Sequence, residues 1–200
     1  MPVNARQRLL TTAEDLFYAE GIRAVGLERI LSTSGVGRAS FYRHFASKDE
    51  LVVAVLQGRD ERWRAWLADR VTALGGGPLA VFDALAERFA RQDFRGCAFI
   101  NTMIENADPA SPAHRVAAQH KTAVAVYVET LLTTAGAPEP AALAAQFTLL
   151  MDGATVTALR ERTAAPAARA RAVAAALLAS AVGPGAEGVT GAVSGGSGSR

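Results

Sequence analysis

The chain has 200 residues, half of them hydrophobic, and a net charge of only +2, so any affinity for a nucleic acid has to come from local clustering of charge. The single cysteine excludes a disulfide framework within the chain and is typical of a reducing cytoplasm. No apolar signal sequence begins the chain, and no apolar run approaches about eighteen residues without a charge, so we predict a cytoplasmic location and no membrane span.

The first predicted helix begins at about Ala5, with Asn4 as its N-cap, and ends between Tyr18 and Glu20, before Gly21. Its apolar residues recur at intervals of three and four along the chain. They form the stripe Leu9, Ala13, Leu16 and Phe17. This stripe is the expected core face of the helix.

A short helix, a glycine-bearing turn and a second short helix follow. Phe41 and Phe45 lie four residues apart and share one face of the second helix. Their candidate packing partners on the preceding helix are Leu27, Ile30 and Leu31. Residues 34–48 contain three basic side chains, one histidine and no acid. Two helices joined in this way form the helix-turn-helix, whose second helix enters the major groove of DNA. The alternative is a solvated face on an ordinary helical hairpin.

The next helix opens with a capping box, in which Ser47 is the N-cap and Glu50 the third helical residue. Lys48 lies in its first turn, where the helix macrodipole disfavours a cation. This position is explained if Lys48 faces an external anion such as a DNA phosphate, because helix N-termini attract phosphates. A solvated lysine is the alternative.

Three segments resemble the N-terminal domain of TetR/AcrR-type transcriptional regulators, over about residues 5–56. They are Ala13-Glu-Asp-Leu-Phe-Tyr-Ala-Glu-Gly21, Glu28-Arg-Ile-Leu31 and Gly35-Val-Gly-Arg-Ala-Ser-Phe-Tyr-Arg-His-Phe-Ala-Ser-Lys-Asp-Glu-Leu51. The resemblance implies an all-α protein with a three-helix, helix-turn-helix DNA-binding domain at residues 1–47. It further implies a helical effector-binding and dimerisation domain at residues 48–182. Residues 183–200 are rich in glycine and serine, and we predict a disordered tail there.

The resemblance also implies roles for individual residues in DNA binding. Tyr42, His44 and Lys48 match positions that contact phosphate, and Arg29 lies on the supporting helix that approaches the DNA. The recognition-helix positions, from which base contacts come, are Gly37, Arg38, Ala39, Ser40 and Arg43. Gly26 departs from the pattern, because the family often has serine or threonine there and glycine is only a modest cap.

Proline and glycine divide the remaining chain into further predicted helices. Their expected ranges are 48–73, 78–93, 99–107, 112–136, 140–162 and 166–182. No segment alternates between apolar and polar residues with a period of two, so we predict no strand.

The last two of these helices carry apolar stripes rich in small residues, which let helices approach closely. Together with the resemblance, they predict a four-helix dimer interface between two copies of the chain. The predicted interface residues are Phe147, Leu150, Met151, Ala154, Val173 and Leu177. The alternative is that these stripes cover only their own domain's core.

Polar residues on the short helix after residue 98 and on the long helix that follows predict the effector site. They are Asn101, Glu105, His120 and Tyr127. A mainly apolar pocket with a few polar groups is the usual form of such a site, so a small, largely apolar effector is expected. The loop residue Cys97 is either a redox sensor or a small side chain without a role.

The histidines lack metal-ligand spacing, and we find no phosphate-binding loop and no nucleophile elbow. We therefore expect no metal, no cofactor and no enzymatic activity; a helical enzyme acting on a small molecule is the alternative of a different class. The resemblance implies a repressor that leaves a palindromic operator in double-stranded DNA when the effector binds. A ligand-responsive activator would use the same scaffold, and this alternative stays open.

Overall fold

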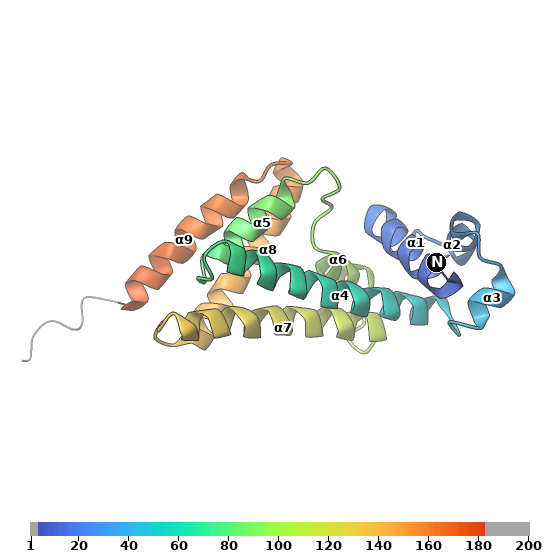
Figure 1. Cartoon of the computed structure of the whole chain (residues 1–200), viewed down its shortest axis with the longest axis horizontal. Coiled ribbons are helices and arrows are strands. Elements are labelled where there is room, and N and C mark those ends of the chain that lie inside the picture. The colour runs from blue at the N-terminus through green and yellow to red at the C-terminus, as the bar shows by residue number, and fades with distance from the viewer. Residues whose placement is uncertain (1–3, 183–200) are drawn as a thin grey trace, which may run out of the picture.

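The computed structural model describes residues 4–182, and every regular element in that range is an α-helix (Figure 1). The helices are α1 (Ala5–Glu20), α2 (Leu27–Ser34), α3 (Arg38–Tyr42), α4 (Lys48–Ala73), α5 (Ala80–Phe89), α6 (Ala98–Glu105), α7 (Pro112–Thr134), α8 (Pro140–Glu161) and α9 (Ala165–Val182). The predicted all-α class is confirmed. The tail predicted for residues 183–200 lies outside the described residues.

The ends of α1 follow the local signals in the sequence. Asn4 Oδ1 accepts a hydrogen bond from the Gln7 N–H at 2.8 Å. Gly21 ends the helix at a φ of 92°, a backbone angle that glycine adopts without steric cost. The four residues of the predicted stripe are the buried residues of this helix. The core face of α1 is therefore the one that its periodicity predicted.

The predicted N-cap at Ser47 of α4 is confirmed, whereas the return bond of Glu50 goes to the residue before the N-cap. Ser47 Oγ accepts from the Glu50 N–H at 3.1 Å, and the Glu50 carboxylate accepts from the Ala46 N–H at 2.6 Å. The first bond satisfies a backbone donor that the first turn of a helix leaves free, and the second satisfies the N–H of the residue before the N-cap. The long helix that begins here runs from the headpiece formed by α1–α3 into the rest of the molecule (Figure 1).

Within residues 4–182, two separate hydrophobic cores stabilise the fold, and α4 contributes to both. Its first half, with Leu51 and Leu56, packs into a core with α1–α3, Phe99 of α6 and the start of α7. Its second half, with Leu67 and Val71, packs into a core with α5, α7, α8 and α9. The headpiece core thus extends across the domain boundary predicted after residue 47.

Helices α5 and α3 end three or four residues earlier than predicted. The sequence predicts a helix over 78–93, whereas α5 ends at Phe89 and the ion pair between Arg91 and Asp93 lies in the turn beyond it. Helix α3 ends at Tyr42, but the Phe45 N–H still donates to the Phe41 carbonyl at 3.0 Å. This helical hydrogen bond keeps Phe45 on the buried side, next to Phe41.

Among the described helices, α8 is the one long and apolar enough to cross a membrane by length and composition. Its mean hydropathy is 1.3 over the most apolar stretch of eighteen residues. Seven of its residues are buried within the chain, and core helices of soluble proteins meet the same criterion.

Candidate nucleic-acid interface and ligand clefts

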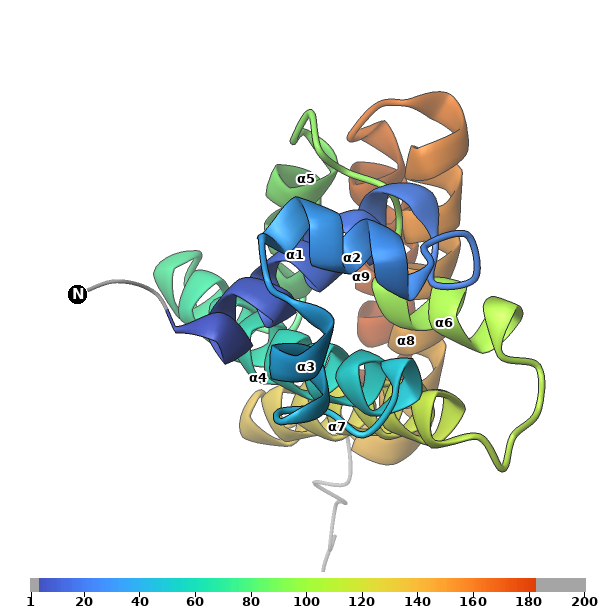
Figure 2. The ribbon, with the colours of Figure 1, turned by 90° about the vertical axis from the view of Figure 1, so that its right-hand side faces the viewer.

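The turn between α2 and α3 sets the orientation of the second helix. Gly35 ends α2 in the left-handed region at a φ of 64°, and Gly37 caps α3. Val36 between them is only 4% exposed and closes the inside of the turn. Helices α2 and α3 lie at the end of the molecule that faces the viewer in Figure 2.

The two faces of α3 and the turn after it differ as the sequence predicts. Phe41 and Phe45 are buried, at 0% and 2% exposure. Tyr42 is 52% exposed. The other exposed residues on this surface are Gly37, Arg38, Ala39, Arg43 and His44, and Ser40 is half-buried. The structure therefore gathers the predicted recognition-helix residues on one solvent-facing surface.

Two of the predicted DNA-binding arginines are paired with acids of the same chain. Arg38 forms an ion pair with Glu28 of α2, and Arg29 lies 3.4 Å from Glu20 of α1. These pairs are exposed, and exposed ion pairs contribute little free energy, so both guanidiniums can exchange their partners. Arg43 forms no ion pair with any residue in the range 4–182.

Lys48 has a structural partner that the sequence did not reveal. Its Nζ donates to the Ile22 carbonyl oxygen at 2.6 Å and lies 5.8 Å from the centroid of the Phe17 ring. The ammonium group thus ties the start of α4 to the loop after α1. An ammonium group has three donors, so this bond leaves two N–H groups for other acceptors.

The structure does not bring the four predicted effector residues together. Asn101 and Glu105 line a narrow cavity of about 30 Å³ between α1, α4 and α6. His120 lines a second cavity of about 40 Å³, and Tyr127 lines a groove of about 440 Å³ along α4 and α7. Helix α7 is long enough that its residues reach different cavities. The expectation of one pocket that holds all four side chains is therefore wrong.

His120 is 3% exposed and is held on three sides. Its ring stacks on Phe99 with the centroids 3.6 Å apart, and Trp63 meets it edge-on at 5.0 Å. Nδ1 donates to Asp60 Oδ1 at 2.7 Å, because a carboxylate can only accept. Burial lowers the pKa of His120 to about 4, against the opposing effect of Asp60. Hydrogen bonds from Arg64 and His120 lower the pKa of Asp60, although burial alone would raise it.

Polar contacts connect α6 and the loop before it to the headpiece. Glu105 accepts from the Arg23 N–H at 2.8 Å, and its carboxylate oxygens lie 3.3 Å from the position that a Cβ on Gly21 would occupy. The Tyr18 hydroxyl donates to the Gly96 carbonyl oxygen at 3.1 Å and accepts from the Arg95 N–H at 2.8 Å. Glu105 therefore has a structural partner in the headpiece.

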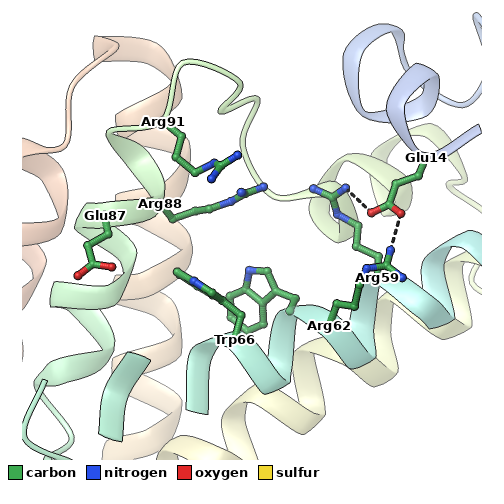
Figure 3. Close-up of a pocket in the computed structure, with 8 residues that line it drawn as sticks. Glu14, Arg59, Arg62, Trp66, Glu87, Arg88 and Arg91 are labelled. Atoms are coloured by element: carbon green, nitrogen blue, oxygen red, sulfur yellow. Dashed lines mark hydrogen bonds and ion pairs between the residues drawn. The ribbon is translucent and has the colours of Figure 1, made fainter. Parts of the chain in front are cut away.

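A further cleft of about 360 Å³, which the sequence did not reveal, opens between α1, α4 and α5 (Figure 3). Its lining residues are Glu14, Arg59, Arg62, Trp63, Trp66, Glu87, Arg88 and Arg91. We call this site the arginine cleft. The arginines come in two pairs three residues apart, Arg59 and Arg62 on α4, and Arg88 at the end of α5 with Arg91 in the turn after it; this spacing is the available sequence signal, because residues three apart share a helix face.

Three of the predicted dimer-interface residues are buried within their own chain. Phe147, Met151 and Ala154 are at most 5% exposed, in the core that α8 forms with α5 and α9. The prediction is corrected for these three, because they have no surface to offer a second chain. Leu150 and Leu177 are half-buried and Val173 is 49% exposed. The large apolar side chains exposed on α8 are Leu149, Val156 and Leu159.

Comparisons with known proteins agree with this architecture. The family model "Bacterial regulatory proteins, tetR family" matches residues 9–55. The crystal structure of SCO4454, a TetR-family transcriptional regulator from Streptomyces coelicolor, is 32% identical and superposes with a TM-score of 0.79 over 88% of this chain and 95% of that one. The HTH-type transcriptional regulator YjdC of Escherichia coli K12 is 26% identical over 80% of this chain and 86% of YjdC. An uncharacterized HTH-type regulator of Lactococcus lactis is 26% identical over 51% of this chain, and the match spans 55% of that protein.

A helix-turn-helix headpiece with an exposed second helix, joined to a helical body formed by α4–α9, defines a DNA-binding regulator of transcription. Within that class, the chain belongs to the TetR family.

Proposed function

We propose that the protein is a cytoplasmic, homodimeric repressor that binds a palindromic site in double-stranded DNA and leaves it when a small effector binds. The observation that carries this proposal is the exposed surface of α3 and the following turn, with Tyr42, Arg43 and His44 outside and Phe41 and Phe45 buried beneath. A rigid apolar support and an exposed basic surface are what a recognition helix needs. The protein acts through binding, without catalytic turnover.

Control by an effector is supported by the contacts between the headpiece and the helical body. The bonds of Tyr18 and Glu105 join α1 and the loop after it to the α5–α6 loop and to α6. A ligand that moves these segments also changes the orientation of the headpiece. Thermodynamic linkage then requires DNA to weaken ligand binding by the same factor as the ligand weakens DNA binding.

The test begins with duplexes selected from random DNA by the full chain. Arg43→Ala should weaken binding to the selected site by about 5- to 150-fold, equivalent to about 1–3 kcal/mol, and relax the preference at one position of each half-site. Tyr42→Phe should weaken selected and random duplexes alike, because a phosphate contact carries no base information. Equal losses on both duplexes for Arg43→Ala would exclude this residue as a base reader.

Repression and activation differ in their effect on transcription. In run-off transcription from a promoter that carries the selected site, the repressor should lower the transcript level as the site fills. An increase in transcript would replace repression by the activator alternative and leave the DNA-binding surface unchanged.

A further inference from the structure

We propose that the arginine cleft binds a small organic anion with a flat apolar ring, such as an aromatic carboxylate, and that this ligand acts by taking Arg59 and Arg62 away from Glu14. The inference rests on the proposed control by an effector and names its chemistry and site. It replaces the small apolar effector that the sequence suggested.

The floor of the cleft suits a flat ring. Trp63 and Trp66 lie side by side on α4 with their ring centroids 6.1 Å apart and their planes at 53°, so they do not stack on each other. Both are half-buried and line the cleft. The cleft volume of about 360 Å³ falls in the range of known ligand sites, about 300–1,000 Å³. The cavity at His120, at about 40 Å³, holds little more than a water molecule.

The walls of the cleft carry a surplus of positive charge. The lining holds four guanidiniums and two carboxylates; Glu87 is engaged by Arg70 at 2.9 and 2.6 Å, and Arg91 pairs with Asp93 outside the lining. No carboxylate within residues 4–182 pairs with Arg88, whose guanidinium reaches across the cleft towards Arg59 in Figure 3. A guanidinium binds a carboxylate through two parallel hydrogen bonds. An anionic ligand would therefore give Arg88 a carboxylate partner that the protein itself does not supply.

The charge of the cleft also discriminates against other ligands. A neutral apolar molecule would remove water from Arg88 without replacing its hydrogen bonds, which is costly for a charged group. A cation would be repelled by the four guanidiniums. The ligand class that complements both the indole rings and the guanidiniums of the cleft is an anion with an apolar ring.

The cleft also lies across the junction between headpiece and body. Glu14 belongs to α1, and it bridges Arg59, at 3.1 Å, and Arg62 of α4 (Figure 3). A ligand carboxylate competes with Glu14 for the same two arginines. Its binding therefore loosens the connection between α1 and α4 and favours orientations of the headpiece other than the DNA-bound one.

Fluorescence of the full chain provides a direct test, because both tryptophans of the sequence line the cleft. Cinnamate is the probe, and cinnamamide is the uncharged control of nearly the same shape. We expect cinnamate to change the tryptophan emission saturably, with an affinity at least about tenfold higher than that of cinnamamide, because charge-assisted hydrogen bonds are the stronger ones. Equal affinities for the two probes would overturn the proposal.

Variants locate the site and test the competition. Arg88→Gln should weaken cinnamate binding about tenfold, and Arg88→Lys should weaken it less, because lysine keeps the charge but not the paired donors. Arg169→Gln on α9 makes the same change in net charge outside the cleft and should bind like the parent protein. Equal effects of the substitutions at Arg88 and Arg169 would refute the site. Melting temperatures of the variants show whether each is folded.

Glu14→Gln provides the decisive variant. Removing the competing carboxylate should tighten cinnamate binding and weaken binding to the selected duplex. If Glu14 had only a structural role, the substitution would not tighten cinnamate binding. If cinnamate binds without weakening DNA binding, the competition mechanism is wrong. If the chain binds its selected duplex and no cinnamate, the cleft proposal fails and the proposed DNA-binding function stands.

Discussion

At the scale of single residues, His120 is the side chain from which we expect a pH-dependent stability. It lies between Phe99 and Trp63 with Asp60 as its polar partner. Burial lowers its pKa to about 4, so the folded protein holds the ring neutral at pH 7. The unfolded chain exposes the same ring to water, where its pKa returns to about 6.5.

The free energy of unfolding should therefore fall as the pH is lowered. The contribution of the neutral His120 ring to this free energy is fully present above pH 6.5 and decreases towards pH 4, by up to about 3 kcal/mol for a pKa shift of this size. Urea unfolding across that range measures the slope. The variant His120→Asn should show a smaller slope, whereas His44→Asn, at an exposed position, should keep that of the parent protein. A stability that does not change between pH 7 and pH 4 would contradict this account.

At the scale of the elements, helix ends and helix lengths decide how the headpiece is supported. Helix α3 spans only five residues, too short to be stable alone. It is held by Phe41 and Phe45, which pack into the core that α1, α2 and the first half of α4 share. The cap on α4 therefore supports the recognition surface as well as its own helix.

Substitutions at Ser47 test the cap of α4. Ser47→Ala removes the acceptor of the Glu50 N–H and should cost about 1 kcal/mol of stability, whereas Ser47→Gly should cost only a few tenths. Chemical denaturation of the two variants measures both changes. Glycine serves as the matched control, because it also lacks the hydroxyl but leaves the N-terminal backbone open to water. A loss that is larger for glycine than for alanine would show that something other than the cap is at work.

At the scale of the whole molecule, α4 connects the headpiece to the helical body, because it contributes to both hydrophobic cores. The arginine cleft, Tyr18 and Glu105 all lie where the headpiece meets the helical body. On the outside of the helical body, α8 and α9 expose Leu149, Val156 and Val173. We propose this outer face as the dimer interface, because exposed apolar side chains on paired helices are suited to a four-helix contact between two copies.

Charged substitutions distinguish this outer face from the core. Val156→Glu should give a folded monomer with weaker DNA binding, because an unpaired charge is costly in a desolvated interface. Phe147→Glu should instead unfold the protein, since Phe147 is fully buried within its own chain. Sedimentation equilibrium and circular dichroism separate the two outcomes. A monomeric parent protein at micromolar concentration would refute the interface.

The sequence by itself determined the features that depend on a few neighbouring residues. The caps at Asn4 and Ser47, the glycine stop at Gly21 and the apolar stripe of α1 act within one or two turns, so they could be predicted without the fold. The helix-turn-helix belongs to the same group, because its motif spans residues that are close in the chain.

Tertiary structure decided what depends on distant partners. Helix α8 is apolar on several sides, and only its packing against α5 and α9 shows that Phe147 lies inside and Leu149 outside. The same holds for Lys48, which reaches the Ile22 carbonyl, and for the arginine cleft, whose walls come from α1, α4 and α5. Burial and ion pairing depend on which surfaces meet in space, and helical periodicity carries no information about the partner.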